Sequence, residues 1–213
     1  MSDILIEIKN AIVDGQNAIA KEKVETALKQ GLNPEDILNT GMVKAMAEVG
    51  WRFERGESFV PEMLLAARAM QSGLVILRGS LVKANFKATG KVAIGTVKGD
   101  LHDIGKNLVS MMLEGAGFDI LDMGTDVDPE KVVAVVKESS PDIVALSALL
   151  TTTMANMKIT IEALKTAGLR DRVKVIVGGA PVTEAYAKQI GADGFSLNAA
   201  RAVNVAKELV GED

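Results

Sequence analysis

The sequence has no cysteine, and only one histidine, one tryptophan and one tyrosine among 213 residues. The absence of cysteine excludes disulfide bonds, thiolate metal sites and thiol nucleophiles, so His102, carboxylates, amides and hydroxyls must carry any chemistry. Lysine and arginine are scattered along the chain and the net charge is -4. Such a sequence lacks the basic face with which proteins follow a phosphate backbone, which argues against nucleic acid as a partner.

Membrane-spanning runs and targeting signals are also missing from the sequence pattern. No apolar run reaches the roughly 18 to 20 residues needed to cross a bilayer, and the first residues, Met1 to Ile4, lack the basic flank of a signal peptide. The 48% of hydrophobic residues is enough for a sizeable buried core in a chain of this length. We therefore expect a globular protein of the cytoplasm with no membrane partner.

Residues 1–86 show helical periodicity, which predicts a bundle of helices. Apolar residues recur every three or four positions at Ile4, Ile8 and Ile12 and again at Ala67, Met70, Leu74, Leu77 and Leu81. Asn33 followed by Pro34 predicts a helix start, with the helix running on through Met46. After a break at 55–57, Pro61 is expected to open the last and longest helix, which ends near Ala84.

A different pattern begins after the polar, turn-like segment 87–90. Short runs rich in valine and isoleucine alternate with segments of helical length, and the strand-like runs are 91–97, 118–124, 142–149, 174–179 and 192–197. This alternation predicts a parallel sheet. We expect a helical domain at 1–86, a linker at 87–90, and at 91–213 a doubly wound, flavodoxin-like domain of five strands in the order 2-1-3-4-5.

Chemistry-bearing residues follow three of the predicted strands. In open α/β folds ligands bind at the carboxyl ends of the strands, so these loops should meet around one crevice. The first loop holds Asp100 and His102, and the others hold Ser147, Leu149 and the pair Gly178-Gly179. A histidine two residues after an aspartate can bind a metal through one nitrogen while the other donates to the carboxylate. It can equally be a solvated loop histidine.

A single histidine limits the metal sites that this chain can build. One protein ligand cannot assemble a zinc or non-haem iron site, so a metal on His102 requires a macrocycle, either haem or a corrin. The other elements also have purely structural interpretations. The hydroxyls at Ser147 and 151–153 can cap a helix, and the paired glycines can form a tight turn.

Together these elements resemble a known signature. Asp100-x-His102-x-x-Gly105, Ser147-x-Leu149 and Gly178-Gly179 resemble the motif of proteins that bind cobalamin in the base-off/His-on state. Upstream, Val49-Gly50-Trp51-Arg52-Phe53, Gly56-Glu57 and Phe59-Val60-Pro61-Glu62 resemble the helical cap of methionine synthase and of small corrinoid proteins of methyltransferase systems. The resemblance covers essentially the whole chain.

The resemblance implies roles for individual residues. His102 would displace the benzimidazole tail of cobalamin and become the lower cobalt ligand, with Asp100 holding its other nitrogen. Thr153 would continue this relay, at a position where family members carry serine. The cofactor-binding loops would contain Asp103, Ile104, Gly105, Ser147, Leu149, Thr151, Gly178 and Gly179. Phe53 and Val60 would cover the upper face of the corrin, although apolar residues at such spacing are otherwise ordinary core.

The implied function is that of a methyl carrier, a non-catalytic or co-catalytic corrinoid subunit. It would take a methyl group as methyl-Co(III) from a substrate-specific methyltransferase and present it to a second methyltransferase. The acceptor would be tetrahydrofolate or a thiol such as coenzyme M, a reductive activase would be a further partner, and segment 87–90 would be a hinge. The sequence does not identify the methyl donor among methylamines, quaternary amines, methanol, methyl thiols and aryl methyl ethers.

Three alternatives stand beside the carrier. A B12-dependent sensor would resemble family members with tryptophan at position 53 and a Glu-His pair at 63–64, where this chain has Phe53, Met63 and Leu64. The small subunit of an adenosylcobalamin mutase shares the signature but normally lacks the cap. A flavodoxin-like domain without B12 would make all three spaced elements coincidental.

Overall fold

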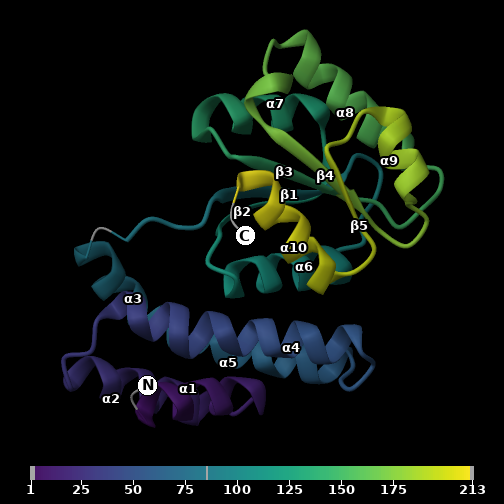
Figure 1. Ribbon diagram of the computed structural model, residues 1–213. Coiled ribbons are helices and arrows are strands. Elements are labelled where there is room, and N and C mark those ends of the chain that lie inside the picture. Colours follow the sequence, from purple (N-terminus) through teal and green to yellow (C-terminus); the bar gives the residue numbers. More distant parts are fainter. Residues whose placement is uncertain (1–2, 85, 212–213) are drawn as a thin grey trace. The chain divides into compact units, whose positions relative to one another are not determined.

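The computed structural model describes residues 3–84 and 86–211, which form two compact units (Figure 1). The first unit comprises residues 1–88 and 114–117, and the second comprises 89–113 and 118–213. Residues 1, 2, 85, 212 and 213, which the expected domains include, lie outside the described residues. The division after Ala88 falls within the segment 87–90.

The first unit is helical, as its periodicity predicts. Its elements are α1 (Asp3–Val13), α2 (Asn17–Lys29), α3 (Pro34–Asp36), a π-helix (Ile37–Val43), α4 (Lys44–Glu54) and α5 (Val60–Lys83). The predicted helix start is confirmed, because the Asn33 side chain accepts a hydrogen bond of 3.0 Å from the Glu35 amide and Pro34 occupies the first turn. The segment 34–54 is not a single α-helix, however, because the π-helix interrupts it.

The interruption coincides with a close approach between two helices. A Cβ atom on Gly41, within the π-helix, would lie 3.2 Å from Cγ2 of Ile8 on α1. Ile8 is fully buried, and the wider π-turn places the glycine directly against it. The hydrophobic spacing used to predict the helix does not reveal such a local change in pitch.

Helix α5 is the longest element of the chain, with 24 residues. Among the described residues, α5 is the one helix that is long and apolar enough to cross a membrane by length and composition. The expectation that no segment of the chain meets this test is therefore wrong. Its small and apolar residues, among them Met63, Ala66, Met70 and Leu77, are buried within the bundle, where α5 packs against α2 and α4. That packing is typical of a core helix.

The second unit contains the expected parallel sheet. Its strands are β1 (Lys91–Val97), β2 (Asp119–Val127), β3 (Ile143–Ser147), β4 (Lys174–Gly178) and β5 (Gly194–Ser196), and the order β2-β1-β3-β4-β5 confirms the prediction. In the register, Thr96 of β1 pairs with Ser147 of β3, which pairs with Gly178 of β4. The three motif-bearing strands are therefore neighbours and end at one edge.

The ends of four strands differ from the predicted ones, although β4 differs by a single residue, ending at Gly178. Strand β2 extends to Val127 and pairs irregularly with β1 near Gly95, whereas β3 stops at Ser147 and β5 is shorter than expected. Strand β3 stops because the amides of Leu149 and Leu150 turn away from the ladder to bind a side chain of another loop. Tertiary contacts thus set the strand ends.

Helices cover both faces of the sheet (Figure 1). They are α6 (Ile104–Gly115), α7 (Pro129–Ser139), α8 (Ala155–Thr166), α9 (Glu184–Ile190) and α10 (Ala199–Val210), with a short 3₁₀ turn at Arg170–Arg172. One core forms where alternate strand residues such as Val97, Val144 and Val177 meet Val132 of α7 and Ile161 of α8. Burial on both faces explains why β1, β3 and β4 are nearly continuous apolar runs.

Candidate functional site

The site lies at the carboxyl edge of the sheet, in the loop that joins β1 to α6. Gly99, with φ of 79°, turns the chain out of β1 and places Asp100 beneath the loop, where this side chain is fully buried. The buried hydroxyl of Thr96 donates to the carbonyl of His102 at 2.8 Å and ties the far side of the loop to the strand. The local fold therefore fixes both ends of the Asp100–His102 segment.

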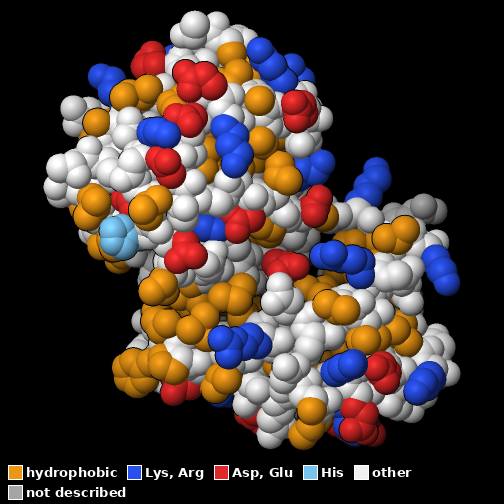
Figure 2. Space-filling model, turned by 180° about the vertical axis from the view of Figure 1, so that it is seen from behind, with side chains coloured by type: hydrophobic (Ala, Val, Ile, Leu, Met, Phe, Trp, Pro, Cys, Tyr) orange, Lys and Arg blue, Asp and Glu red, His pale blue; other side chains and the backbone are white. Residues whose placement is uncertain are grey.

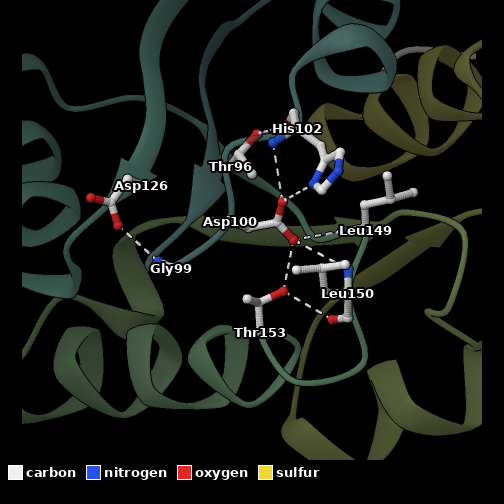
Figure 3. A network of polar contacts seen from close by, with 8 residues as sticks. All are labelled: Thr96, Gly99, Asp100, His102, Asp126, Leu149, Leu150 and Thr153. Atoms are coloured by element: carbon white, nitrogen blue, oxygen red, sulfur yellow. Dashed lines mark hydrogen bonds and ion pairs between the residues drawn. The ribbon is translucent and has the colours of Figure 1, made fainter.

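Asp100 is the centre of a network that joins two loops (Figure 3). Its Oδ1 accepts from the His102 amide at 3.1 Å and lies 2.7 Å from Nδ1 of His102. Its Oδ2 accepts from the amides of Leu149 at 2.9 Å and Leu150 at 3.2 Å, and from the Thr153 hydroxyl at 2.7 Å. The hydroxyl also lies 2.9 Å from the Leu150 carbonyl, but its one proton favours the closer, charged carboxylate.

These contacts determine the charge of Asp100 and the tautomer of His102. Burial raises the pKa of Asp100, but hydrogen bonds from Thr153, His102 and the Leu149 amide outweigh burial and hold this pKa well below its ordinary value. An ionised carboxylate only accepts hydrogen bonds, so Nδ1 of His102 carries a proton, and in the neutral imidazole the lone pair is therefore on Nε2. The His102 side chain is 51% exposed, which leaves this nitrogen accessible from solvent.

The described residues do not form a complete metal site around His102 by themselves. Among residues 3–84 and 86–211, no group of three or more histidine, cysteine, aspartate or glutamate side chains is placed to hold one. A metal bound at His102 therefore has to bring its remaining ligands with it, as a macrocycle does.

Several large apolar side chains in the loops that follow the strands are exposed. Leu101, Ile104 and Leu197 expose 72%, 77% and 78% of their surface, and Leu149 and Leu150 are also exposed. Figure 2, in which the histidine is pale blue, shows hydrophobic side chains beside it on the surface. Several exposed apolar residues around one polar group are typical of a ligand site.

Two glycines at the end of β4, Gly178 within the strand and Gly179 after it, allow the backbones of neighbouring loops to approach closely. A Cβ on Gly179, whose φ is 128°, would lie 1.9 Å from the carbonyl oxygen of Ala148, and a Cβ on Gly178 would lie 3.0 Å from that of Ser196. The fold itself therefore requires glycine at 179. At Gly105, on the first turn of α6, the corresponding direction is open, with no atom within 4 Å.

The other residues expected at the site take different positions. Ser147 is half-buried at the end of β3, Thr151 is exposed in the turn before α8, and Asp103 accepts from the Asn107 side chain at 3.0 Å. Phe53 and Val60 belong to the helical unit, at the end of α4 and the start of α5. Phe53 is half-buried and Val60 is 39% exposed, so neither is an ordinary core residue of the bundle.

Sequence reasoning missed several residues that hold the loop. Asp126 accepts from the Gly99 amide at 2.8 Å, and the Asn156 side chain donates to the Lys98 carbonyl at 2.8 Å. Lys106, which is almost fully buried, donates to Asp122 at 2.6 Å and Asn107 at 2.7 Å. Lys106 directly follows Gly105 of the signature. Asp126 lies near the carboxyl end of β2, where ligand-binding residues are expected in open α/β folds. A prediction of β2 at its full length would therefore have pointed to Asp126.

Comparison with known proteins identifies the family. B12 binding domain models match residues 90–204 and residues 4–78. The chain belongs to the B12-binding corrinoid proteins. This corrinoid protein is 44% identical over 209 residues to the dimethylamine corrinoid protein of Methanosarcina barkeri, with 98% of each chain covered. It is 45% identical over 203 residues to the trimethylamine corrinoid protein of the same organism, with 94% of each covered.

A solved structure supports the same assignment. The methanol:cobalamin methyltransferase complex of Methanosarcina barkeri matches with a TM-score of 0.86 and 28% identity, over 100% of this chain and 81% of that chain. The expected family, fold class and cobalamin cofactor are confirmed by these findings.

The residues at the site fit a corrinoid. The half-exposed imidazole has one nitrogen bound to a buried carboxylate, which leaves its other nitrogen for a ligand, and Leu101 and Ile104 in the same loop are exposed. A flat macrocycle would cover those apolar side chains and supply the further metal ligands that the described residues do not provide as a group of three or more.

Proposed function

We propose that this corrinoid protein is a methyl carrier that binds cobalamin base-off with His102 as the lower ligand of cobalt. The observation that supports this most directly is the preformed network around Asp100, which keeps the proton on Nδ1 of His102 and leaves Nε2 free. Bound cobalamin supplies a cobalt ion that accepts and donates the methyl group. The protein then acts as the methyl-carrying subunit between methyltransferases.

The residues of the β1–α6 and β3–α8 loops do the positioning. His102 would hold the cofactor, while Asp100 fixes the orientation of the imidazole and Thr153 fixes Asp100. The exposed side chains of Leu101 and Ile104 would be covered by the bound cofactor and would then help to exclude water from the ligand nitrogen.

We assign the displaced nucleotide tail to the carboxyl edge of β3 and β4. Ser147 and Thr151 offer it hydroxyl groups, and Gly105 and the glycine pair offer it space. Phe53 and Val60 of the helical unit would shield the upper face of the corrin. Asp103, Ile104 and Leu149 complete the loops on the lower side.

The helical unit is proposed as a cap and residues 87–90 as its hinge. Residues 86–88 form no regular helix or strand, and the chain passes from one compact unit to the other after Ala88. A covered cobalt has to be uncovered before a partner enzyme can reach it, which requires such a hinge.

The partners follow from the carrier role. A substrate-specific methyltransferase would load the carrier, and a second methyltransferase, using tetrahydrofolate or a thiol such as coenzyme M, would unload it. A reductive activase would recover inactive cobalt, and all of this would take place in the cytoplasm. Relatives of nearly equal similarity are named for dimethylamine and for trimethylamine, so we attribute the choice of donor to the partner enzyme.

Electron paramagnetic resonance of the cob(II)alamin-loaded protein tests the ligand assignment. With 15N in the benzimidazole, wild type should show the splitting of a 14N axial ligand, and His102→Ala should lose it. Added imidazole should restore an axial nitrogen signal in His102→Ala, which controls for misfolding. A 15N splitting in wild type would refute His102 as the ligand.

A further inference from the structure

Asp126 has an unusual backbone conformation. Its φ is 52°, and Ser140 is the other non-glycine residue with positive φ in the described part of the chain. Ser140 merely ends helix α7, whereas Asp126 lies near the end of β2, beside the site. A left-handed conformation in a residue with a side chain costs free energy and persists where the surrounding structure enforces it.

The contacts of Asp126 explain this conformation. Its amide donates to the carbonyl of Asp100 at 3.0 Å. Its Oδ1 accepts from the amide of Gly99 at 2.8 Å (Figure 3). One residue of β2 therefore binds two consecutive residues of the β1–α6 loop. The left-handed turn thus accompanies two bonds from the amide and the carboxylate of Asp126 to the same loop.

Electrostatics favour the same arrangement. Lys98 lies 3.4 Å from Asp126 and 3.2 Å from Asp128. The hydrogen bond from the Gly99 amide lowers the pKa of Asp126, and the nearby Lys98 lowers this pKa further. Desolvation raises the pKa, but by less, so the pKa of Asp126 lies below its ordinary value. The carboxylate is therefore ionised at neutral pH and is a strong acceptor for the Gly99 amide.

We propose that Asp126 is a positioning residue that fixes the Asp100 backbone, and through Asp100 the imidazole of His102, before cobalamin binds. This inference rests on the proposed function and extends the site to the β2 edge. The backbone of Asp100 is held at its amide by Val97 at 3.1 Å and at its carbonyl by Asp126. Removal of the Asp126 carboxylate takes away the restraint on Gly99. The bond from the Asp126 amide to the Asp100 carbonyl is a backbone bond, and it is weakened in variants that disfavour the left-handed conformation.

The consequence concerns the geometry of the short contacts. Asp100 lies 2.7 Å from both His102 Nδ1 and Thr153 Oγ1, and it has no exposed surface through which to readjust. A small displacement of its backbone lengthens both contacts, and loss of a group that orients a metal ligand typically weakens metal binding by about 10- to 100-fold.

Four variants separate the roles of Asp126. Asp126→Asn keeps an acceptor oxygen and tolerates positive φ, Asp126→Gly keeps only the backbone freedom, and Asp126→Ala loses both. The matched control is Asp128→Asn, which changes the other carboxylate beside Lys98 and leaves the loop contacts intact. Thermal unfolding checks that each variant folds, and Asp126→Gly remains informative if Asp126→Ala does not.

Two measurements are made on each variant. In the apo protein, hydrogen exchange of the Gly99 amide should accelerate roughly tenfold or more in Asp126→Gly and stay near wild type in Asp126→Asn. Absorbance titration with hydroxocobalamin should give a dissociation constant raised by about tenfold in Asp126→Gly. Asp126→Asn should stay within about threefold of wild type, and Asp128→Asn should match wild type.

The possible results are distinguishable. Wild-type exchange and affinity in Asp126→Gly would overturn the proposal, and so would a loss in Asp126→Asn as large as that in Asp126→Gly. Failure of the proposed function appears separately, as a benzimidazole 15N splitting in the wild-type protein. Faster Gly99 exchange in apo Asp126→Gly without any change in cobalamin affinity would refute the link to the cofactor site.

Discussion

The substitution Asp100→Asn tests the central network most severely. Five donors converge on the two carboxylate oxygens of Asp100, from the amides of His102, Leu149 and Leu150, from Nδ1 of His102 and from the Thr153 hydroxyl. Asparagine has one acceptor oxygen and places an NH₂ donor at the other position. Whichever way the amide turns, some of these donors face another donor.

One orientation of the asparagine is clearly preferred. If its oxygen replaces Oδ2, it keeps the bonds from Leu149, Leu150 and Thr153, and the NH₂ group faces His102. The imidazole then relieves the conflict by accepting at Nδ1, which moves its proton to Nε2. The nitrogen that would bind cobalt is thereby protonated. The variant should fold yet lose the ligand.

The magnitude follows from the bond that is lost. A hydrogen bond to a charged group contributes about 1.5 to 3 kcal/mol, and each 1.4 kcal/mol corresponds to roughly tenfold in a binding constant. We therefore expect the affinity for cobalamin to fall by about 10- to 100-fold, in agreement with the usual effect of removing a group that orients a metal ligand.

Two assays follow this prediction. Absorbance titration measures the affinity, and 15N NMR of the apo protein reports which ring nitrogen carries the proton, free of overlap because the chain has one histidine. Thr153→Val is the matched control, since it removes one donor but keeps the carboxylate and the Nδ1–H tautomer. If Asp100→Asn keeps both the Nδ1–H tautomer and wild-type affinity, the reasoning is refuted.

Three further predictions concern the glycine pair, low pH and the hinge. Gly179→Ala should lower the free energy of unfolding by about 3 kcal/mol or more, because its Cβ would overlap the Ala148 carbonyl. Gly191→Ala, at a position with φ of 77° and open space, should lower it by about 1 to 2 kcal/mol. Equal losses for the two variants in denaturant titrations would contradict this prediction. Burial raises the pKa of Asp122, but hydrogen bonds from Lys106 and the Gly124 amide hold this pKa below its ordinary value. The Asp122 carboxylate therefore stabilises the fold above the pKa of the unfolded state, and this stabilisation is lost as pH falls through the folded-state pKa. Unfolding free energies measured between about pH 5 and pH 3 should therefore fall less steeply in Asp122→Asn than in wild type, and identical slopes would argue against it. Cleavage at a protease site placed within 87–90 should spare cobalamin binding and suppress methyl transfer between partner enzymes; unchanged transfer would exclude a hinge role.

Much of the fold was predictable because its signals are local. Asn33 and Pro34 mark a helix start through their own backbone preferences, and runs such as 91–97 mark strands buried on both faces. The signature at Asp100, His102 and Gly105 was readable because residue type and spacing are properties of the chain. Strand order followed from the alternation of strands with helices, and it places three of these loops at one edge of the sheet.

The positions of the polar groups were decided by tertiary structure. The donors to Asp100 come from the neighbouring residue His102 and from Leu149, Leu150 and Thr153 about fifty positions away, so only the folded sheet sets the charge of Asp100 and the tautomer of His102. The π-helix at Ile37–Val43 depends on the approach of Ile8. The left-handed turn at Asp126 depends on the Gly99 amide that it binds.

The sequence by itself thus determined the order of the elements and the residue types available for chemistry, because propensity, hydrophobic spacing and motif spacing reside in short stretches of chain. The tertiary structure alone decided that Asp100 is fully buried yet ionised and that His102 holds its proton on Nδ1. Burial and hydrogen bonding are properties of neighbours in space, and most of the groups that act on Asp100 lie far from it along the chain.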